Sequence, residues 1–146
     1  MVIVADQLSK TWVLEAPGMG RAYPLLGDLV VIRPTLNPGG IFGLFPGAGW
    51  LFLVLTAVVV VFLAVWAWRQ DALLAIFGLV LGGGVGNLLD RIFRGPRLFT
   101  GRVVDFIELP YWPTFNLADS AISVGVLILL VRSVVRREDE PVAGRE

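Results

Sequence analysis

The chain has 146 residues, of which 56% are hydrophobic and only 16% are charged. Soluble domains carry roughly 25% charged residues, so this sequence has too few of them to cover a soluble surface. Its 12 basic and 12 acidic residues give a net charge of zero, which argues against nucleic acid as a partner. The length corresponds to a single domain over residues 1–146.

Neither cysteine nor histidine occurs in the sequence. Their absence excludes disulfides, thiol nucleophiles, Ser-His-Asp triads and metal sites built from Cys or His. We therefore expect no metal and no cofactor. Any acid–base chemistry falls to carboxylates or to Lys10, the only lysine.

Four segments are typical of membrane helices, which need about 20 residues to cross a bilayer. They lie at about residues 1–15, 50–68, 72–91 and 116–135. The first is short, and we expect it to be a membrane helix that lacks its opening half. Only residues 69–71 separate the second and third helices, which favours an antiparallel hairpin. The expected fold is an all-α membrane protein, a bundle of four transmembrane helices.

Two other segments, about residues 17–49 and 93–115, are rich in proline, glycine and charge. Within them, residues 29–33 predict a short strand, and Val103–Leu109 predicts a strand or an extended piece. Four helices place both segments on the same side, where we expect a small β-rich cap. This side carries Arg21, Arg33, Arg94, Arg97 and Arg102. By the positive-inside rule, these arginines mildly favour a cytoplasmic cap.

Ionisable residues inside membrane segments are costly and are candidates for function. In this sequence they gather at the helix ends that face the cap. Asp6 and Lys10 are four residues apart and can form an ion pair on one helical face, either as a structural element or in support of a site. Asn87, Asp90 and Arg91 share the end of another helix, where a salt-bridged helix end explains them equally well.

Two glycine-rich runs have simpler explanations. The run Asn37-Pro-Gly-Gly-Ile-Phe-Gly43 offers backbone N–H groups and an amide, although a plain loop explains it more simply. Gly82 and Gly86 have the spacing that lets membrane helices approach closely, so we expect them to serve packing.

Two further carboxylates suggest a catalytic pair. Asp105 shares one face of the predicted strand with Val103 and Ile107, and that face is otherwise apolar. Asp119 forms a capping-box pattern with Asn116, which gives Asp119 a structural explanation of its own. Prolines between Asp105 and Asp119 exclude a single helix, but a turn could bring the carboxylates face to face. Aspartic proteases use such a pair, which shares one proton across a water. A helix N-terminus favours the anion, so we expect Asp119 to be the base and Asp105 the acid.

Five short motifs stand in a fixed order relative to the apolar helices. They are Asp6-Gln-Leu-Ser-Lys10, Asn37-x-Gly-x-x-Phe42-Gly43, Gly86-Asn-Leu-Leu-Asp-Arg91, Val103-Val-Asp-Phe-Ile107 and Phe115-Asn-Leu-Ala-Asp-Ser-Ala121. Each is weak alone. Together, over most of the chain, they resemble the lipoprotein signal peptidases (signal peptidase II) of bacteria.

This resemblance implies an aspartic endopeptidase of the bacterial inner membrane with a small extracytoplasmic β-cradle. Such enzymes act on diacylglyceryl-modified prolipoproteins in the membrane lipid, cleave before the lipidated Cys, and are inhibited by globomycin-type antibiotics. By motif, the catalytic pair falls on Asp105 and Asp119. The residues that would bind substrate or support the site are Asp6, Lys10, Asn37, Gly39, Phe42, Asn87, Asp90, Arg91 and Asn116. The resemblance also places the cap on the extracytoplasmic side, whereas the count of arginines mildly favours the cytoplasmic side.

The sequence departs from the family pattern at two places. Gly40 and Ile41 stand where the family usually has two alanines, which affects the expected substrate groove. The stretch from Phe93 to Arg102 is slightly long, so the resemblance does not define the shape of this loop.

Three other interpretations remain open at this point. A transporter or proton relay would spread carboxylates through the membrane depth and over both sides. A serine hydrolase would use Lys10 as base with Ser9, Ser120 or Ser123. A purely structural membrane subunit would leave the cluster of acids unexplained.

Overall fold

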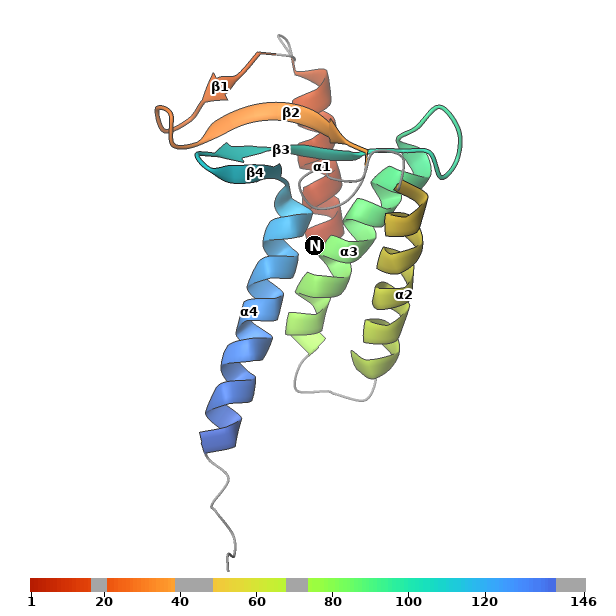
Figure 1. The fold of residues 1–146 in the computed structure, drawn as a ribbon, viewed down its shortest axis with the longest axis vertical. Helices are drawn as coiled ribbons and strands as arrows, with labels where there is room; N and C mark the ends of the chain where they lie inside the picture. Colours follow the sequence, from red (N-terminus) through yellow and green to blue (C-terminus); the bar gives the residue numbers. More distant parts are fainter. Residues whose placement is uncertain (17–20, 39–48, 68–73, 139–146) are drawn as a thin grey trace, which may run out of the picture.

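The computed structural model describes residues 1–16, 21–38, 49–67 and 74–138. These ranges contain four helices and one four-stranded antiparallel sheet. The helices are α1 (Val2–Glu15), α2 (Gly49–Ala67), α3 (Leu74–Phe93) and α4 (Leu117–Glu138). The strands are β1 (Tyr23–Pro24), β2 (Val31–Asn37), β3 (Val103–Leu109) and β4 (Trp112–Phe115). The sheet lies across one end of the helices, and we call it the cap (Figure 1).

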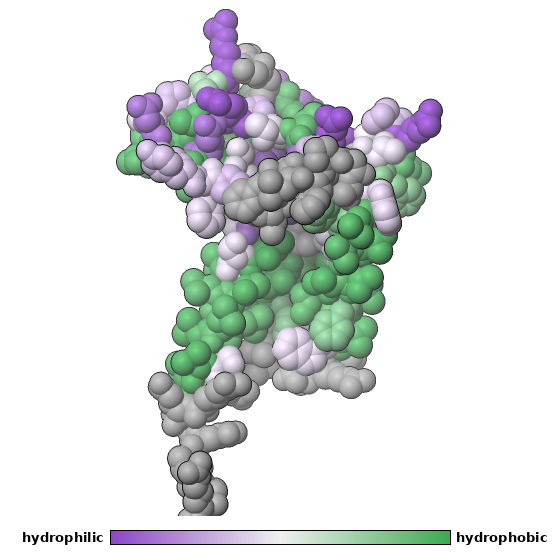
Figure 2. Space-filling model, viewed as in Figure 1, coloured by the Kyte–Doolittle hydropathy of each residue, from purple (hydrophilic) through white to green (hydrophobic). Residues whose placement is uncertain are grey.

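The surface of the helices is largely apolar. Two of those described are long and apolar enough to cross a membrane, over Ala75–Phe93 and Leu117–Val135, and α2 is apolar over the shorter stretch Trp50–Trp66. On the face drawn in Figure 2, hydrophobic side chains form a belt over the helices, and hydrophilic side chains are concentrated on the cap. Exposed apolar area of this extent is suited to lipid rather than to water. The predicted turn at residues 69–71 lies outside the described residues.

α3 packs against the other three helices, and its glycines permit the close approach. A Cβ at Gly82 would lie 2.8 Å from the Cβ of Val2 in α1, and a Cβ at Gly86 would lie 2.6 Å from Asp6 Oδ2. On another side of α3, a Cβ at Gly83 would clash with the backbone of α4. The predicted packing role of Gly82 and Gly86 is therefore confirmed.

The cap is anchored on α1 through one face of β3. Val104 and Phe106 of β3 form a buried cluster with Val13 of α1. Val103 and Asp105, on the alternate positions of the same strand, line a cavity instead. β3 therefore fixes the cap to the helices with one face and turns a carboxylate toward the cavity with the other.

The strand predictions were right for β3 and partly wrong for β2. The strand expected at residues 29–33 runs instead over Val31–Asn37. Leu29 lies in the turn that joins β1 to β2, where its N–H donates to Leu26 O at 3.1 Å. β1 and β4 were not predicted, because β1 has only two residues and β4 contains Pro113.

Candidate active site

Two carboxylates from different elements line one cavity at the junction of the cap and the helices. Asp105 lies on β3, and Asp119 lies in the first turn of α4. The cavity has a volume of about 460 Å³. Its lining also includes Asn37, Phe52, Asn87, Arg91, Trp112, Phe115 and Ile122. The site therefore combines a small number of convergent polar groups with an apolar wall.

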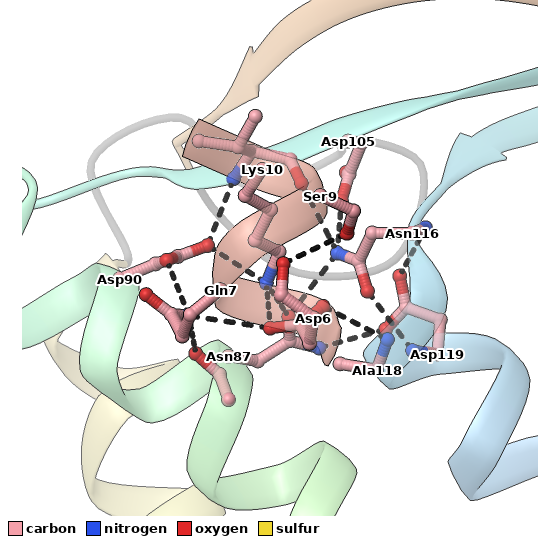
Figure 3. A network of polar contacts seen from close by, with 12 residues as sticks. Asp6, Gln7, Ser9, Lys10, Asn87, Asp90, Asp105, Asn116, Ala118 and Asp119 are labelled. Carbon is pink, nitrogen blue, oxygen red and sulfur yellow. Dashed lines mark hydrogen bonds and ion pairs between the residues drawn. The ribbon is translucent and has the colours of Figure 1, made fainter. Parts of the chain in front are cut away.

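Asn116 hydrogen-bonds to both aspartates (Figure 3). Its Nδ2 donates to Asp105 Oδ1 at 2.7 Å, and its Oδ1 accepts the backbone N–H of Asp119 at 2.9 Å. The Asn116 N–H in turn donates to Asp119 Oδ2 at 3.2 Å. This is a reciprocal capping box, so the predicted capping pattern is confirmed. The same residue that starts α4 also orients Asp105.

Lys10 is the centre of a buried polar network next to the carboxylates (Figure 3). Its Nζ lies 2.8 Å from Asp6 Oδ2 and 2.8 Å from Asp90 Oδ2. It also donates to Asn87 Oδ1 at 2.9 Å. These three acceptors match the three donors of an ammonium group. The predicted ion pair between Asp6 and Lys10 is confirmed.

The two acids paired with Lys10 also hold the backbone of the elements that carry the cavity carboxylates. Asp6 Oδ1 accepts the N–H of Ala118 in α4 at 3.0 Å. Asp90 Oδ2 accepts the N–H of Val104 on β3 at 3.1 Å. The ion pairs therefore fix the start of α4 and the middle of β3 relative to α1 and α3.

Asn87 connects this network to Asp119. An ammonium group only donates, so the Asn87 atom that faces Lys10 is the amide oxygen. The amide nitrogen then faces Asp119 and donates to its Oδ1 at 2.8 Å. Arg91, one turn later on α3, is buried and is among the residues that line the cavity, and its Nη1 donates to Asn87 O at 3.3 Å.

The surroundings of each cavity carboxylate affect its charge. Burial raises the pKa of Asp105 from its ordinary value of 3.8 to about 6. The hydrogen bond from Asn37 Nδ2 to Asp105 Oδ2, at 3.0 Å, opposes this rise in pKa, and the negative charge of Asp119 adds to it. Asp119 instead lies at the N-terminus of α4, where the helix dipole favours a negative charge.

Two members of the network were not singled out from the sequence. Gln7 Nε2 donates to Asp90 Oδ1 at 3.0 Å, and Arg94 Nε donates to the same oxygen at 2.8 Å. Arg94 follows Asp90 by four residues, a helical spacing that could have indicated the pair. Gly39 and Phe42, which the resemblance assigns to the site, lie outside the described residues and stay predictions.

The hydrogen bonds argue against a serine hydrolase. Ser9 Oγ donates to the backbone oxygen three residues earlier at 2.8 Å, and Ser120 Oγ donates to the backbone oxygen four residues earlier at 3.0 Å. Ser123 lines the cavity, but the three donors of Lys10 already face Asp6, Asp90 and Asn87. Lys10 is therefore not available as a base.

The distribution of charge also disfavours a transporter. Within the described residues, Asp6 of α1, Asp90 of α3 and Asp119 of α4 meet in one network at the cap end of the helices (Figure 3). A relay through the membrane would need such groups at several depths.

The sequence of this chain matches those of known peptidases over nearly its whole length. The sequence model of the family described as signal peptidase (SPase) II matches residues 1–135. The lipoprotein signal peptidase of Syntrophomonas wolfei is 40% identical over 134 residues, which are 90% of this chain and 86% of that protein. The lipoprotein signal peptidase of Rhodococcus jostii is 38% identical over 142 residues, which are 96% of this chain and 72% of that protein.

The fold matches solved structures of bacterial membrane enzymes. One, at 24% identity, superposes with a TM-score of 0.83 over 99% of this chain and 90% of the other. A second, at 26% identity, has a TM-score of 0.74 and covers 90% of this chain and 86% of the other. With the family match and the identity to the two peptidases, the assignment is clear: this chain belongs to the signal peptidase II family.

Proposed function

We propose that this chain is an aspartic endopeptidase that removes the signal peptide from diacylglyceryl-modified prolipoproteins, with Asp105 and Asp119 as the catalytic pair. One observation carries the assignment of the pair. The two carboxylates line the same cavity at the cap end of the helices, and Asn116 hydrogen-bonds to both residues. Family membership supplies the reaction class and the prolipoprotein substrate.

In the proposed mechanism, Asp119 is the general base and Asp105 the general acid. The Asp119 carboxylate takes a proton from a water held between the two carboxyl groups, and the water oxygen attacks the scissile carbonyl carbon. Protonated Asp105 donates to the carbonyl oxygen as it becomes negative. Collapse of the tetrahedral intermediate breaks the C–N bond, and the proton on Asp119 passes to the leaving nitrogen. As the carboxyl product forms, a hydroxyl of the intermediate returns to Asp105 the proton that Asp105 gave to the carbonyl oxygen. The raised pKa of Asp105, about 6, supports its role as the proton donor.

The cavity suits a substrate that remains partly in lipid. Its apolar wall includes Phe52 and Ile122 from helices of the apolar belt, while Asn37 and Arg91 add donors near the carboxylates. We assign the apolar wall to the diacylglyceryl group and the adjoining signal peptide. The peptide bond then reaches water while the acyl chains stay in the bilayer.

The remaining proposals concern placement and inhibition. We propose that all four helices belong to a multi-pass arrangement in the bacterial inner membrane, with the cap on the extracytoplasmic side. The single domain, residues 1–146, then presents its site to prolipoproteins after their export. Globomycin-type compounds are the inhibitors expected at this cavity.

Cleavage of a synthetic diacylglyceryl prolipoprotein peptide by the purified protein in lipid tests the function. We expect cleavage before the lipidated Cys, preference for the acylated over the unmodified peptide, and inhibition by globomycin. Asp28→Asn, at an exposed position in the β1–β2 turn, is a matched control that keeps full activity. Equal cleavage of both peptides would indicate a general membrane protease, and no cleavage of either would contradict the proposal.

A further inference from the structure

The loop between α3 and β3, residues 94–102, has a composition that the proteolytic site does not explain. It contains Arg94, Arg97 and Arg102 and no acidic residue. It also exposes two large apolar side chains, Leu98 at 62% and Phe99 at 58% of their surface. Cationic and apolar groups are thus exposed side by side, outside the cavity described above.

The backbone of this loop is held in a defined shape that keeps Leu98 and Phe99 exposed. Phe99 has a φ of +66°, a left-handed conformation that bulky residues rarely adopt. The Phe99 N–H donates to Ile92 O at 3.0 Å, and Thr100 Oγ1 donates to Arg97 O at 2.7 Å. A non-glycine residue in this conformation requires support from its surroundings, and these bonds provide it.

The three arginines differ in their partners. Arg94 is committed to the polar network, with its Nε 2.8 Å from Asp90 Oδ1. Arg97 and Arg102 are exposed, and neither forms an ion pair with any carboxylate in the part of the chain that the structure describes. Two cationic side chains therefore remain available to an external anion.

The position of the loop identifies that anion. The loop begins at Arg94, directly after the apolar stretch of α3 that ends at Phe93. Figure 2 shows its hydrophilic side chains projecting beside hydrophobic ones at the upper edge of the hydrophobic belt. A soluble anion would not require exposed Leu98 and Phe99, whereas a bilayer interface offers acyl chains and phosphates at the same level.

We propose that the loop of residues 94–102 binds the head groups of anionic phospholipids, with Leu98 and Phe99 inserted among the acyl chains and Arg97 and Arg102 on the phosphates. This explains the excess of arginine on the cap side, which the positive-inside rule leaves unexplained for an outward-facing cap. The arginines serve as lipid ligands. The inference concerns a surface separate from Asp105 and Asp119, so it is tested without peptidase activity.

The absence of natural cysteines makes a single label straightforward. A nitroxide is attached at Leu98→Cys, the protein is reconstituted into vesicles, and the depth of the label is measured from its collisions with oxygen and with a water-soluble nickel chelate. The vesicles contain phosphatidylcholine with increasing fractions of phosphatidylglycerol. We expect the label to move into the bilayer as the anionic fraction rises, and to withdraw at high salt.

Variants distinguish lipid binding from mere proximity to the membrane. Arg97→Gln and Arg102→Gln are each expected to raise the phosphatidylglycerol fraction needed for insertion by about five-fold, since one arginine near an anionic surface contributes about 1 kcal/mol. Arg33→Gln also removes a charge from the cap, but Arg33 already pairs with Glu108. This variant should leave the phosphatidylglycerol fraction needed for insertion unchanged. A label at Tyr111→Cys, on an exposed turn of the cap, should not respond to lipid charge.

Two results of the vesicle series would overturn the inference. One is a label at position 98 that stays in water in every vesicle, and the other is insertion that is independent of lipid charge and of Arg97 and Arg102. Inorganic phosphate added to phosphatidylcholine vesicles tests whether the loop binds a soluble anion instead of a lipid head group. If phosphate alone changed the mobility of the label, a free-anion site would replace the lipid site.

Discussion

At the scale of single residues, the site depends on polar side chains that are buried and fully bonded. Lys10, Asp6, Asp90 and Asn116 have essentially no exposed surface. Among the described residues, every buried side-chain nitrogen and oxygen has a hydrogen-bond partner. A network of this kind is sensitive to the loss of one member, because the partner groups are then left buried and unpaired.

Lys10→Met tests that dependence. Removing the ammonium leaves Asp6 and Asp90 buried without their shared cation, so we expect a loss of about 3–5 kcal/mol in the free energy of unfolding. Arg33→Gln is the comparison, because Arg33 and Glu108 are partly exposed and their pair is worth at most about 1 kcal/mol. Denaturation in detergent measures both, and equal effects would contradict the account of the network.

The raised pKa of Asp105 predicts a pH dependence of stability. Between its ordinary value of 3.8 and the folded value of about 6, the folded chain binds more protons at Asp105 than the unfolded chain does. Stability should therefore fall as the pH rises through this interval, by up to about 3 kcal/mol from this group. The measurement is the melting temperature of the wild type minus that of Asp105→Asn between pH 4 and pH 7.

We expect that difference to decrease with rising pH. Asp28→Asn, at an exposed position in the β1–β2 turn, is the control variant measured in the same way. Parallel curves for the wild type and Asp105→Asn would show that the pKa of Asp105 is not raised in the folded protein.

At the residue scale, contacts between residues close together in the sequence were easier to predict than contacts between residues far apart in it. The ion pair of Asp6 with Lys10 and the capping box of Asn116 with Asp119 follow from helical spacing. The bond from Ala118 N–H to Asp6 joins residues 112 positions apart, and no local pattern predicts it. Such contacts depend on how the helices pack.

At the scale of elements, α3 organises the bundle through its small residues. Gly86→Ala would place a Cβ 2.6 Å from Asp6 Oδ2 and so displace a carboxylate that pairs with Lys10. We expect a loss of about 1–3 kcal/mol in stability from the steric conflict.

Gly78→Ala is the matched control on the same helix, because nothing lies within 4 Å of the added Cβ. There the better helix propensity of alanine should give a gain of up to about 1 kcal/mol. Thermal unfolding of the two variants checks the pair. A Gly86→Ala protein as stable as Gly78→Ala would contradict the close packing of α1 on α3.

The helices were more predictable than the strands, of which only β3 was predicted with the right bounds, and the reasons are physical. A run of apolar residues long enough for a membrane indicates a helix without reference to the rest of the chain, as for α2 and α4. The strands of the cap are short and paired across long separations. Ile32 on β2, for example, lies opposite Ile107 on β3. The register of β2 is set by the turn before it and by β3, which the sequence of β2 alone does not contain.

At the scale of the whole molecule, the proposed orientation can be measured directly. In the proposed arrangement, single cysteines at Tyr111, in the turn between β3 and β4, and at Arg137, near the C-terminal end of α4, report on opposite sides of the bilayer. With an impermeant maleimide, we expect labelling of Tyr111→Cys in intact cells and of Arg137→Cys only after permeabilisation. The reverse pattern would place the cap in the cytoplasm, as the arginine count alone suggests.

In the proposed mechanism, Asp105 and Asp119 act as one unit on one water. The most direct measurement is a double-mutant cycle on single-turnover cleavage of the diacylglyceryl peptide. We predict that Asp105→Asn and Asp119→Asn each slow cleavage by about 10²–10⁴-fold, and that the double variant is no slower than the worse single variant. Losses that multiply in the double variant, or a single variant that retains wild-type rate, would contradict the claim that the two carboxylates form a catalytic pair.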